Sequence, residues 1–375
     1  MNLAPALPLL LLAALLALPL LGWVILRRPG QAGGSRLAAL TTLVAFLTFD
    51  LIVFGAFTRL SDSGLGCPDW PGCYGHASPI GAREPIAAAQ AALPSGPVTP
   101  HKAWIEMIHR YLAMTVGALI LVLAVASWSS RRKLRVSPWW PTLTLLWVIV
   151  QGLFGKYTVT LKLYPAVVTL HLLGGLLLLS LLMVQREAWS ARRVDMPALA
   201  PGLTRWAWIA LALLVVQITL GGWVSTNYAV LACSGFPACS GQWWPAMDAS
   251  GFAVLRDLGH DARGRLLPFE ALVAIHWAHR SFAWIATLAA ALLAGGLIRQ
   301  PHPWARRFGR GLALLLALQW ASGLSNVVLD WPLVAALLHT AGAAAMVALL
   351  TSLLARAARR RPWPAAVEAR AAALA

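Results

Sequence analysis

The chain has 375 residues, of which 59% are apolar and only 11% are charged. Because an ordinary soluble domain carries about a quarter charged residues and the mean hydropathy here is +0.70, composition excludes a soluble protein and indicates an integral membrane protein. The formal net charge of +17 would suit a nucleic-acid ligand, but the basic residues follow membrane topology instead, so we expect no nucleic-acid partner.

Apolar runs of about 20 residues, the length that an α-helix needs to cross a bilayer, recur along the whole chain. A membrane β-barrel would show short alternating segments. The first run has no basic residue before it and is too long for a signal peptide, so we expect an uncleaved helix there. We predict an all-α polytopic protein with spans at residues 4–26, 37–59, 105–128, 139–159, 164–185, 205–226, 270–297, 309–329 and 333–355.

The basic residues give the orientation. Twenty of the 30 Lys and Arg residues lie at 27–36, 131–135, 186–205, 299–310 and 356–370. These segments share one side of the membrane, and the positive-inside rule makes that side the cytoplasm. The sequence therefore predicts a multi-pass protein of a bacterial-type inner (cell) membrane. The long loops 60–103 and 227–269 lie outside, and the C-terminus is cytoplasmic.

Each long outer loop contains a pair of cysteines separated by five residues. Cys67 and Cys73 lie in CPDWPGC, and Cys233 and Cys239 lie in CSGFPAC. Thiols oxidise on the outer side, so we predict the disulfides Cys67–Cys73 and Cys233–Cys239. A zinc site built from four thiolates is the alternative, and a redox-active pair remains open.

The chain is an internal duplication. Five landmarks recur in the same order at offsets of 166 to 170 residues: Gly55 with Gly221, Cys67/Cys73 with Cys233/Cys239, His109 with His279, Gln151 with Gln319, and His171 with His339. An even number of helices per copy makes the repeats parallel. We predict two four-helix bundles, eight helices in all, at 37–190 and 205–360. An extra N-terminal helix and linker occupy 1–36, a cytoplasmic linker occupies 191–204, and a cytoplasmic tail occupies 361–375.

Four histidines lie at one depth near the outer ends of predicted spans. His109 and His171 belong to the first bundle, and His279 and His339 to the second. Two imidazoles from facing helices of a four-helix bundle form an axial ligand pair for heme iron, and small residues beside them would let a macrocycle approach: Gly117, Gly174, Gly175 and Gly342. The alternative is that each histidine makes one interhelical hydrogen bond. Zinc or copper is disfavoured because acidic or thiolate partners are lacking nearby.

The residues beside the histidines differ between the copies. Arg110 and Arg280 directly follow the first histidine of each copy and are candidates to pair with heme propionates, although they also suit contact with lipid phosphate. Glu106 precedes His109 by three residues, where the second copy has His276. A carboxyl near iron can transfer protons; the alternative is an acid stabilised by the helix dipole. The asymmetry assigns the chemistry to the first bundle and an electron-transfer cofactor to the second.

Several other polar residues lie within predicted spans. Asp50 is expected to be buried and to make a polar contact between helices, and three glutamines are expected to hydrogen-bond between helices as packing residues: Gln151, Gln217 and Gln319.

The motifs together resemble the heme A synthase family. The first copy contains GAFTRLSDSGLGCPDWPGC, EMIHR, QGLFGKYTV and TLHLLGG, and the second contains QITLGGWV, AHR and LLHTAG. The resemblance covers residues 37–355. It departs from the family pattern in the additional helix at 4–26, and in Leu51, which stands where Gln217 stands in the second copy.

The resemblance implies an eight-helix membrane oxidoreductase that oxidises a methyl group of heme O to the formyl group of heme A, for cytochrome oxidase assembly. It implies His109 and His171 as ligands of the substrate heme, and His279 and His339 as ligands of a heme b cofactor. Glu106 matches the family's functionally important glutamate. Expected partners are heme O, heme O synthase and cytochrome oxidase assembly proteins, with a possible homo-oligomer. The alternative is a quinol-linked electron-transfer protein with two bis-histidine hemes.

Overall fold

The computed structural model describes residues 5–26, 33–133, 136–189 and 199–358. All regular elements in these ranges are helical, and nine helices are long and apolar enough to cross a membrane. The predicted class, an all-α multi-pass membrane protein, is confirmed. The linker residues 27–32 and 190–198 and the tail from 359 lie outside the described residues, so the interdomain boundaries assigned there remain predictions.

The membrane-spanning helices agree with the predicted spans to within a few residues, and they are α1 (Ala6–Leu26), α2 (Gly33–Leu60), α4 (Pro100–Ser129), α5 (Trp139–Thr160), α6 (Pro165–Trp189), α7 (Pro201–Thr226), α8 (Phe269–Ile298), α9 (Pro303–Val328) and α10 (Leu333–Ala358). Helix α4 begins earlier than its apolar run because Thr99 caps it, accepting a hydrogen bond from Lys102 N at 3.2 Å. The sequence did not predict α3 (Arg83–Ala92), a helix in the loop after the first cysteine pair that buries only Ile86. Three short 3-10 helices are η1 (Arg131–Lys133), η2 (Ala229–Leu231) and η3 (Ala249–Phe252).

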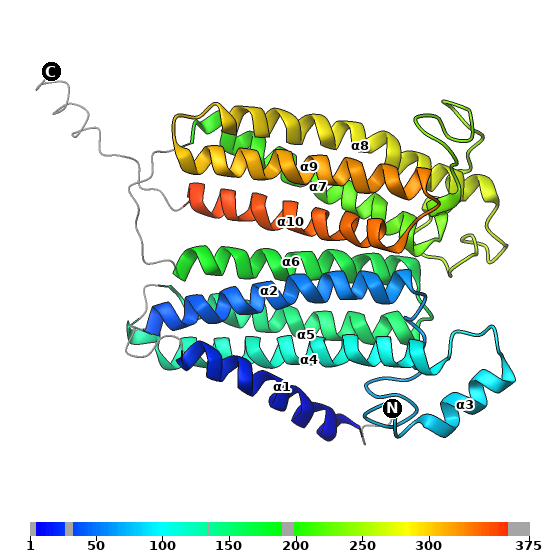
Figure 1. The fold of residues 1–375 in the computed structure, drawn as a ribbon, viewed down its shortest axis with the longest axis horizontal. Helices are drawn as coiled ribbons and strands as arrows, with labels where there is room; N and C mark the ends of the chain where they lie inside the picture. The colour runs from blue at the N-terminus through cyan, green and yellow to red at the C-terminus, as the bar shows by residue number, and fades with distance from the viewer. Residues whose placement is uncertain (1–4, 27–32, 134–135, 190–198, 359–375) are drawn as a thin grey trace, which may run out of the picture.

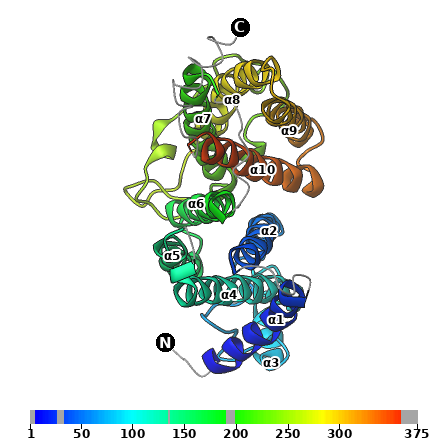
Figure 2. The ribbon, with the colours of Figure 1, turned by 90° about the vertical axis from the view of Figure 1, so that its left-hand side faces the viewer.

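The helices form two rings of four (Figures 1 and 2). In the first ring, α4 packs against α2 and α5, and α6 packs against the same two helices. Helices α4 and α6 are therefore diagonal to each other across the first bundle. In the second ring α8 and α10 are diagonal in the same way, because both pack against α7 and α9. The diagonal helices are the ones that carry the four histidines.

The rings meet along α6 and α10, with α2 packed on α10 and α7 packed on α6. Near the cysteine loops, Arg59 donates a 2.7 Å hydrogen bond to Ser225 O, and Tyr228 donates one of 2.9 Å to Asp62. Each pair is separated by 166 residues, which is the offset between the copies. Equivalent positions therefore touch, as expected where parallel repeats are related by an axis along the membrane normal.

An ion pair joins the rings at the end opposite the cysteine loops. Glu187, at the end of α6, is 5% exposed. It accepts two hydrogen bonds from Arg356 at the end of α10, of 2.8 Å from Nε and 3.1 Å from Nη2. Arg186 also approaches Glu187, at 3.1 Å. The two-pronged contact is the geometry in which arginine and carboxylate bind most strongly.

Helix α1 packs against α4 and the edge of α2, outside the first ring. It buries one face, carrying Leu9, Ala13, Ala17 and Val24, and leaves most of its other leucines exposed. Its first turn lies against the first cysteine loop (Figure 1), where Leu9 packs with Cys67 and Cys73.

Replacing Arg356 with Ala should lower the free energy of unfolding by about 1–3 kcal/mol. Breaking a buried pair costs about 3–5 kcal/mol, and the 31% exposure of Arg356 reduces that value. Thermal unfolding of the purified protein in detergent micelles measures the loss. Arg186→Ala is the matched control: its side chain is 39% exposed, so its effect should stay below about 1 kcal/mol. Equal losses in the two variants would contradict a specific role for Arg356.

Candidate functional site

The four histidines lie on diagonal helices at the same depth. His109 is on α4 and His171 on α6. His279 is on α8 and His339 on α10, with ring centres 6.5 Å apart and ring planes at 81°. Two imidazoles that bind one metal ion from opposite sides, through bonds of about 2 Å, have ring centres roughly 6 Å apart. The second pair thus has the spacing of an axial ligand pair.

Each histidine ring faces a glycine on a neighbouring helix. A Cβ added to Gly55 would lie 3.0 Å from His109, and one added to Gly221 would lie 2.9 Å from His279. Gly323 stands in the same way against His339 at 3.1 Å, whereas a Cβ at Gly155 would make an ordinary contact with His171 at 3.6 Å. At the three tighter positions a side chain would crowd the ring, so glycine allows the close approach.

These glycines differ from those that the sequence suggested. Gly117 faces open space, Gly174 and Gly342 face glutamines, and Gly175 touches Ile52. The repeat alignment contained the correct signal, because Gly55 and Gly221 are equivalent, as are Gly155 and Gly323. The sequence prediction chose glycines that lie near the histidines along the chain, whereas the glycines that face the rings lie on neighbouring helices.

The donor set fits heme. Within the described residues, no cluster of three or more His, Cys, Asp or Glu side chains could hold a metal ion. Two imidazoles are therefore too few for a metal site made of protein alone. A porphyrin supplies four nitrogens of its own, so two imidazoles complete the coordination of its iron.

The second pair is held by further side chains. Ser322 Oγ lies 3.1 Å from His339 Nδ1, and Gln319 donates a 2.8 Å hydrogen bond to His339 O. The amide of Gln217 lies 3.1 Å from His279 Nδ1 and 3.2 Å from His279 O. Two of the three glutamines predicted to be packing residues therefore contact the histidines directly.

The first pair lacks such support. His171 Nδ1 is buried without a partner, and so are both polar atoms of the Gln151 side chain. The His109 ring stacks on Phe54 with centres 6.3 Å apart, and no hydrogen bond to this ring exists among the described residues.

Glu106 and Arg110 fasten the first cysteine loop to α4. Both are buried, at 3% and 9% exposure, and they pair at 2.5 Å. Glu106 accepts the backbone N–H of Cys67 at 2.8 Å, while Arg110 donates to the carbonyls of Asp69, at 2.8 Å, and Gly72. Arg110 is thus bound to the loop in this structure, and its proposed pairing with a propionate remains a prediction.

Arg280 does the same in the second copy. It donates to the carbonyls of Cys233 at 3.4 Å, Gly235 at 2.6 Å and Ala238 at 3.4 Å. His276, which replaces Glu106, is buried and its Nδ1 has no partner. The arginine clamp is common to both copies, whereas the carboxylate belongs to the first alone.

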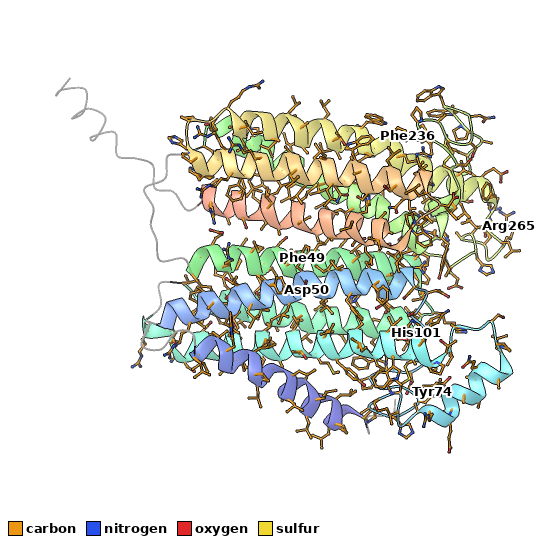
Figure 3. All side chains as sticks on the ribbon, in the orientation of Figure 1. Phe49, Asp50, Tyr74, His101, Phe236 and Arg265 are labelled. Carbon is orange, nitrogen blue, oxygen red and sulfur yellow. A yellow bond between two sulfur atoms is a disulfide. The ribbon has the colours of Figure 1, made fainter. Side chains whose placement is uncertain are left out.

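Both cysteine pairs are disulfides, as predicted. The S–S distances are 2.09 Å for Cys67–Cys73 and 1.98 Å for Cys233–Cys239, which excludes a four-thiolate zinc site. The loops lie at the same end of the molecule, where Figure 3 labels Tyr74 in one and Phe236 in the other.

Asp50 departs from its prediction. Its side chain is exposed on the middle of α2 (Figure 3) and makes no hydrogen bond or ion pair within the described residues. The expected burial and interhelical contact are therefore wrong. The hydropathy of the run predicted a helix but did not show which way position 50 points.

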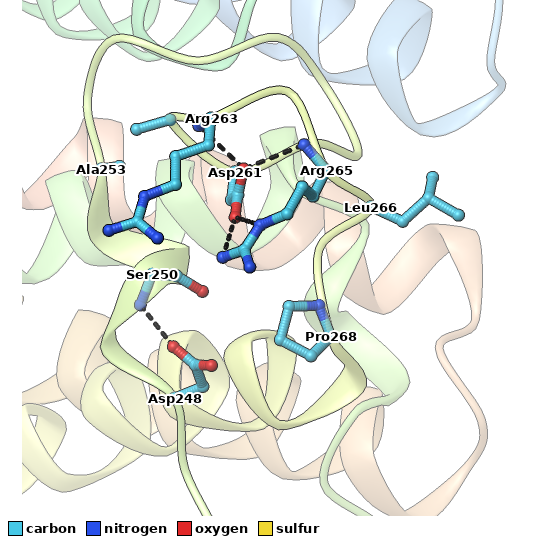
Figure 4. Close-up of a pocket in the computed structure, with 9 residues that line it drawn as sticks. Asp248, Ser250, Ala253, Asp261, Arg263, Arg265, Leu266 and Pro268 are labelled. Carbon is cyan, nitrogen blue, oxygen red and sulfur yellow. Dashed lines mark hydrogen bonds and ion pairs between the residues drawn. The ribbon is translucent and has the colours of Figure 1, made fainter.

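A cavity of about 570 Å³ lies in the second long loop, away from the histidines (Figure 4). Asp261 in its wall accepts the backbone N–H groups of Arg265 at 3.0 Å and Arg263 at 2.8 Å, and pairs with the Arg265 side chain. These hydrogen bonds hold the pKa of the Asp261 carboxyl below its usual value. The charge of Asp261 is thus balanced by groups of its own loop. The cavity contributes no residue to the histidine pairs.

Comparison with known proteins agrees with this arrangement. A family model named COX15-CtaA and described as cytochrome oxidase assembly protein matches residues 38–351; α1 precedes the match. The heme A synthase of Shewanella oneidensis is 38% identical over 323 residues, which are 85% of this chain and 96% of that protein. The heme A synthase of Sphingopyxis alaskensis is 29% identical over 89% of this chain and 94% of its own. That of Halalkalibacterium halodurans is 25% identical over 80% and 89%.

Replacing Arg110 with Lys should loosen the first cysteine loop, because lysine cannot reach several carbonyls at once. Hydrogen bonds from a charged group contribute about 1.5–3 kcal/mol each, so amide hydrogen exchange at residues 67–73 should accelerate at least about tenfold. Lys102→Ala, which removes only a part-exposed pair with Asp62, is the control and should leave exchange unchanged. Unchanged exchange in Arg110→Lys would refute the clamp.

Replacing Gly221 with Ala should displace the His279 ring. Overfilling a packed site costs about 1–3 kcal/mol, so heme affinity of the second pair should fall roughly tenfold. Gly202→Ala, in the same helix with open space around it, is the matched control. Heme bound per chain, from absorbance of the purified protein, measures the change. Equal heme content in both variants would show that the glycine is not needed.

Proposed function

The chain belongs to the COX15-CtaA family of cytochrome oxidase assembly proteins, and from this premise we propose that it is a heme A synthase. This membrane oxidoreductase converts a methyl group of heme O to the formyl group of heme A. The observation that carries the assignment of roles is the buried carboxylate of Glu106, which stands beside only one of the two histidine pairs.

The first bundle is the proposed substrate site. His109 and His171 face each other across it and would hold the iron of heme O from both sides. Heme is apolar except at its propionates, and the bundle lining is correspondingly apolar, so this substrate can enter from the lipid. Oxidising the methyl group takes two successive hydroxylations, each of which would insert one oxygen atom of dioxygen into a C–H bond and reduce the other to water with two electrons and two protons. The geminal diol then loses water to give the formyl group.

Glu106 is the proposed proton-handling residue. It lies one helical turn before His109, so its carboxylate is on the same face of α4. Its contacts with Arg110 and Cys67 N fix its position at the mouth of the bundle. A carboxylate fixed in this way can accept and return protons close to the substrate without rearrangement of the loop.

The second bundle is the proposed cofactor site. His279 and His339 would hold a heme b, which supplies electrons to the reaction when bound. The protein keeps this site dry and rigid through α7 to α10, and it contains no carboxylate at the position of Glu106. A site that only passes electrons needs no proton acceptor.

The orientation follows from charge and cysteine chemistry. Basic residues gather at the end of the bundles opposite the disulfides, including Arg131, Arg186, Arg299, Arg306 and Arg356. This distribution supports a cytoplasmic location for that end. The cysteine loops then lie outside, where disulfides persist. The enzyme that makes heme O and cytochrome oxidase assembly proteins are the proposed partners.

Replacing Glu106 with Gln should leave heme binding intact and lower conversion of heme O at least about 100-fold, the lower range for a lost acid–base group. The variant keeps an oxygen to accept the Cys67 N–H but loses the carboxylate. Extraction of hemes from aerobic cells that produce heme O, followed by chromatography, measures the products.

His276→Gln, the same substitution at the equivalent position of the second copy, is the matched control and should keep conversion. Hydrogen exchange at residues 67–73 tests whether the Glu106→Gln loop remains ordered. Normal conversion by Glu106→Gln would remove this residue from the mechanism. Failure of the unaltered chain to oxidise bound heme O would refute the proposed function itself.

A further inference from the structure

The two histidine pairs differ in what holds each ring, and the difference follows the repeat. At the position of Gln217 the first copy has Leu51, and at the position of Ser322 it has Phe154. We propose that Gln217 and Ser322 are positioning residues that make the second pair a permanent heme site, and that Leu51 and Phe154 leave the first pair free to exchange its heme. This inference rests on the proposed function and names residues that distinguish the cofactor site from the substrate site.

Ser322 determines which nitrogen of His339 carries the proton. The Ser322 hydroxyl donates its hydrogen to Leu318 O at 2.7 Å, so its oxygen faces His339 Nδ1, 3.1 Å away, as an acceptor. Nδ1 must then be protonated, because a hydroxyl has one hydrogen to donate. The lone pair of Nε2 is left for iron, which is the usual state of a metal-binding histidine.

Gln217 positions His279 from the neighbouring helix α7. Its amide nitrogen lies 3.1 Å from His279 Nδ1 and donates to His279 O at 3.2 Å. The side chain therefore contacts both the ring and the backbone of His279 and restricts the orientation of the imidazole.

The matching groups in the first copy do none of this. His171 Nδ1 has no partner in its buried position. Leu51 and Phe154 have no hydrogen-bonding group to offer. Gln151, the counterpart of Gln319, has no partner either, whereas Gln319 holds His339 O at 2.8 Å. In the second copy the side chains at all three positions contact a histidine. In the first copy none of their counterparts hydrogen-bonds to a histidine within the described residues.

Side-chain contacts of this kind to the ligating histidines slow the release of heme from the site. A partner on Nδ1 fixes the orientation of the imidazole and makes it a better electron donor, and its removal typically costs 10–100-fold in metal affinity. An enzyme that takes in heme O and releases heme A must let go of heme in each turnover. A heme that only carries electrons must stay, so the supported pair suits the cofactor and the unsupported pair suits the substrate.

The test uses the purified full-length chain loaded with heme b in detergent. In a His109→Ala/His171→Ala background only the second site is filled, and transfer of heme to excess apomyoglobin gives its release rate. Gln217→Leu and Ser322→Ala should each accelerate release at least about tenfold. Ser322→Ala should also raise the midpoint potential, because a weaker donor stabilises ferric iron less. Ser322→Thr, which keeps the hydroxyl, should restore both values.

Gln151→Leu is the matched control in the same background, since it removes a buried glutamine that touches no histidine ring by hydrogen bond. It should leave release and potential at the second site unchanged. The converse variant is Leu51→Gln in a His279→Ala/His339→Ala background, where release from the first site should slow at least about tenfold. Unchanged release in Gln217→Leu and Ser322→Ala, or in Leu51→Gln, would overturn the proposal. So would an equal effect of Gln151→Leu.

These measurements stand apart from the proposed function because they need no turnover. If the unaltered chain fails to oxidise heme O, the synthase assignment fails, while the release rates and potentials still decide whether Gln217 and Ser322 hold heme. If conversion is normal but the variants release heme at the unaltered rate, the synthase assignment stands and this inference fails.

Discussion

The close approach between a histidine ring and a glycine on the next helix constrains both bundles. Three of the four rings lie about 3 Å from where a Cβ on that glycine would stand, and His171 lies 3.6 Å from the Cβ position of Gly155. A side chain at the three tighter positions would push the neighbouring helix or the imidazole away. The placement of the histidines in both bundles therefore depends on these glycines.

On this common frame, duplication has kept some contacts and changed others. In both copies, the arginine that follows the first histidine donates hydrogen bonds to backbone carbonyls of the disulfide loop. The groups around the histidines differ between the copies. The first copy has an acid, Glu106, and its histidine rings lack hydrogen-bonded support, whereas the second copy has Gln217 and Ser322. These differences stand beside the histidines, while the ring of four helices is common to both copies.

Much of the fold was predictable because lipid imposes a simple rule on sequence. The nine spans, the two disulfides and the repeat followed from hydropathy, cysteine spacing and landmark order. Side-chain direction was not predictable from these patterns. Asp50 was expected to be buried and is exposed, and the hydrogen bonds from Arg110 to the loop carbonyls were not foreseen. The glycines and glutamines that serve the histidines were visible in the repeat alignment, but only the packing of α2, α5, α7 and α9 shows which ones face a ring.

The contacts where the bundles meet also bear on how the chain arose. Two identical subunits related by a twofold axis place each axial residue against its own copy. At such an axis Asp62 would oppose another aspartate, and Arg59 another arginine, which repel. In this chain Asp62 instead meets the Tyr228 hydroxyl, and Arg59 meets the Ser225 carbonyl and the Tyr228 ring. Such complementary pairs form only between unlike side chains, so this seam requires two copies that have diverged, and a symmetric dimer of either copy alone would lack it.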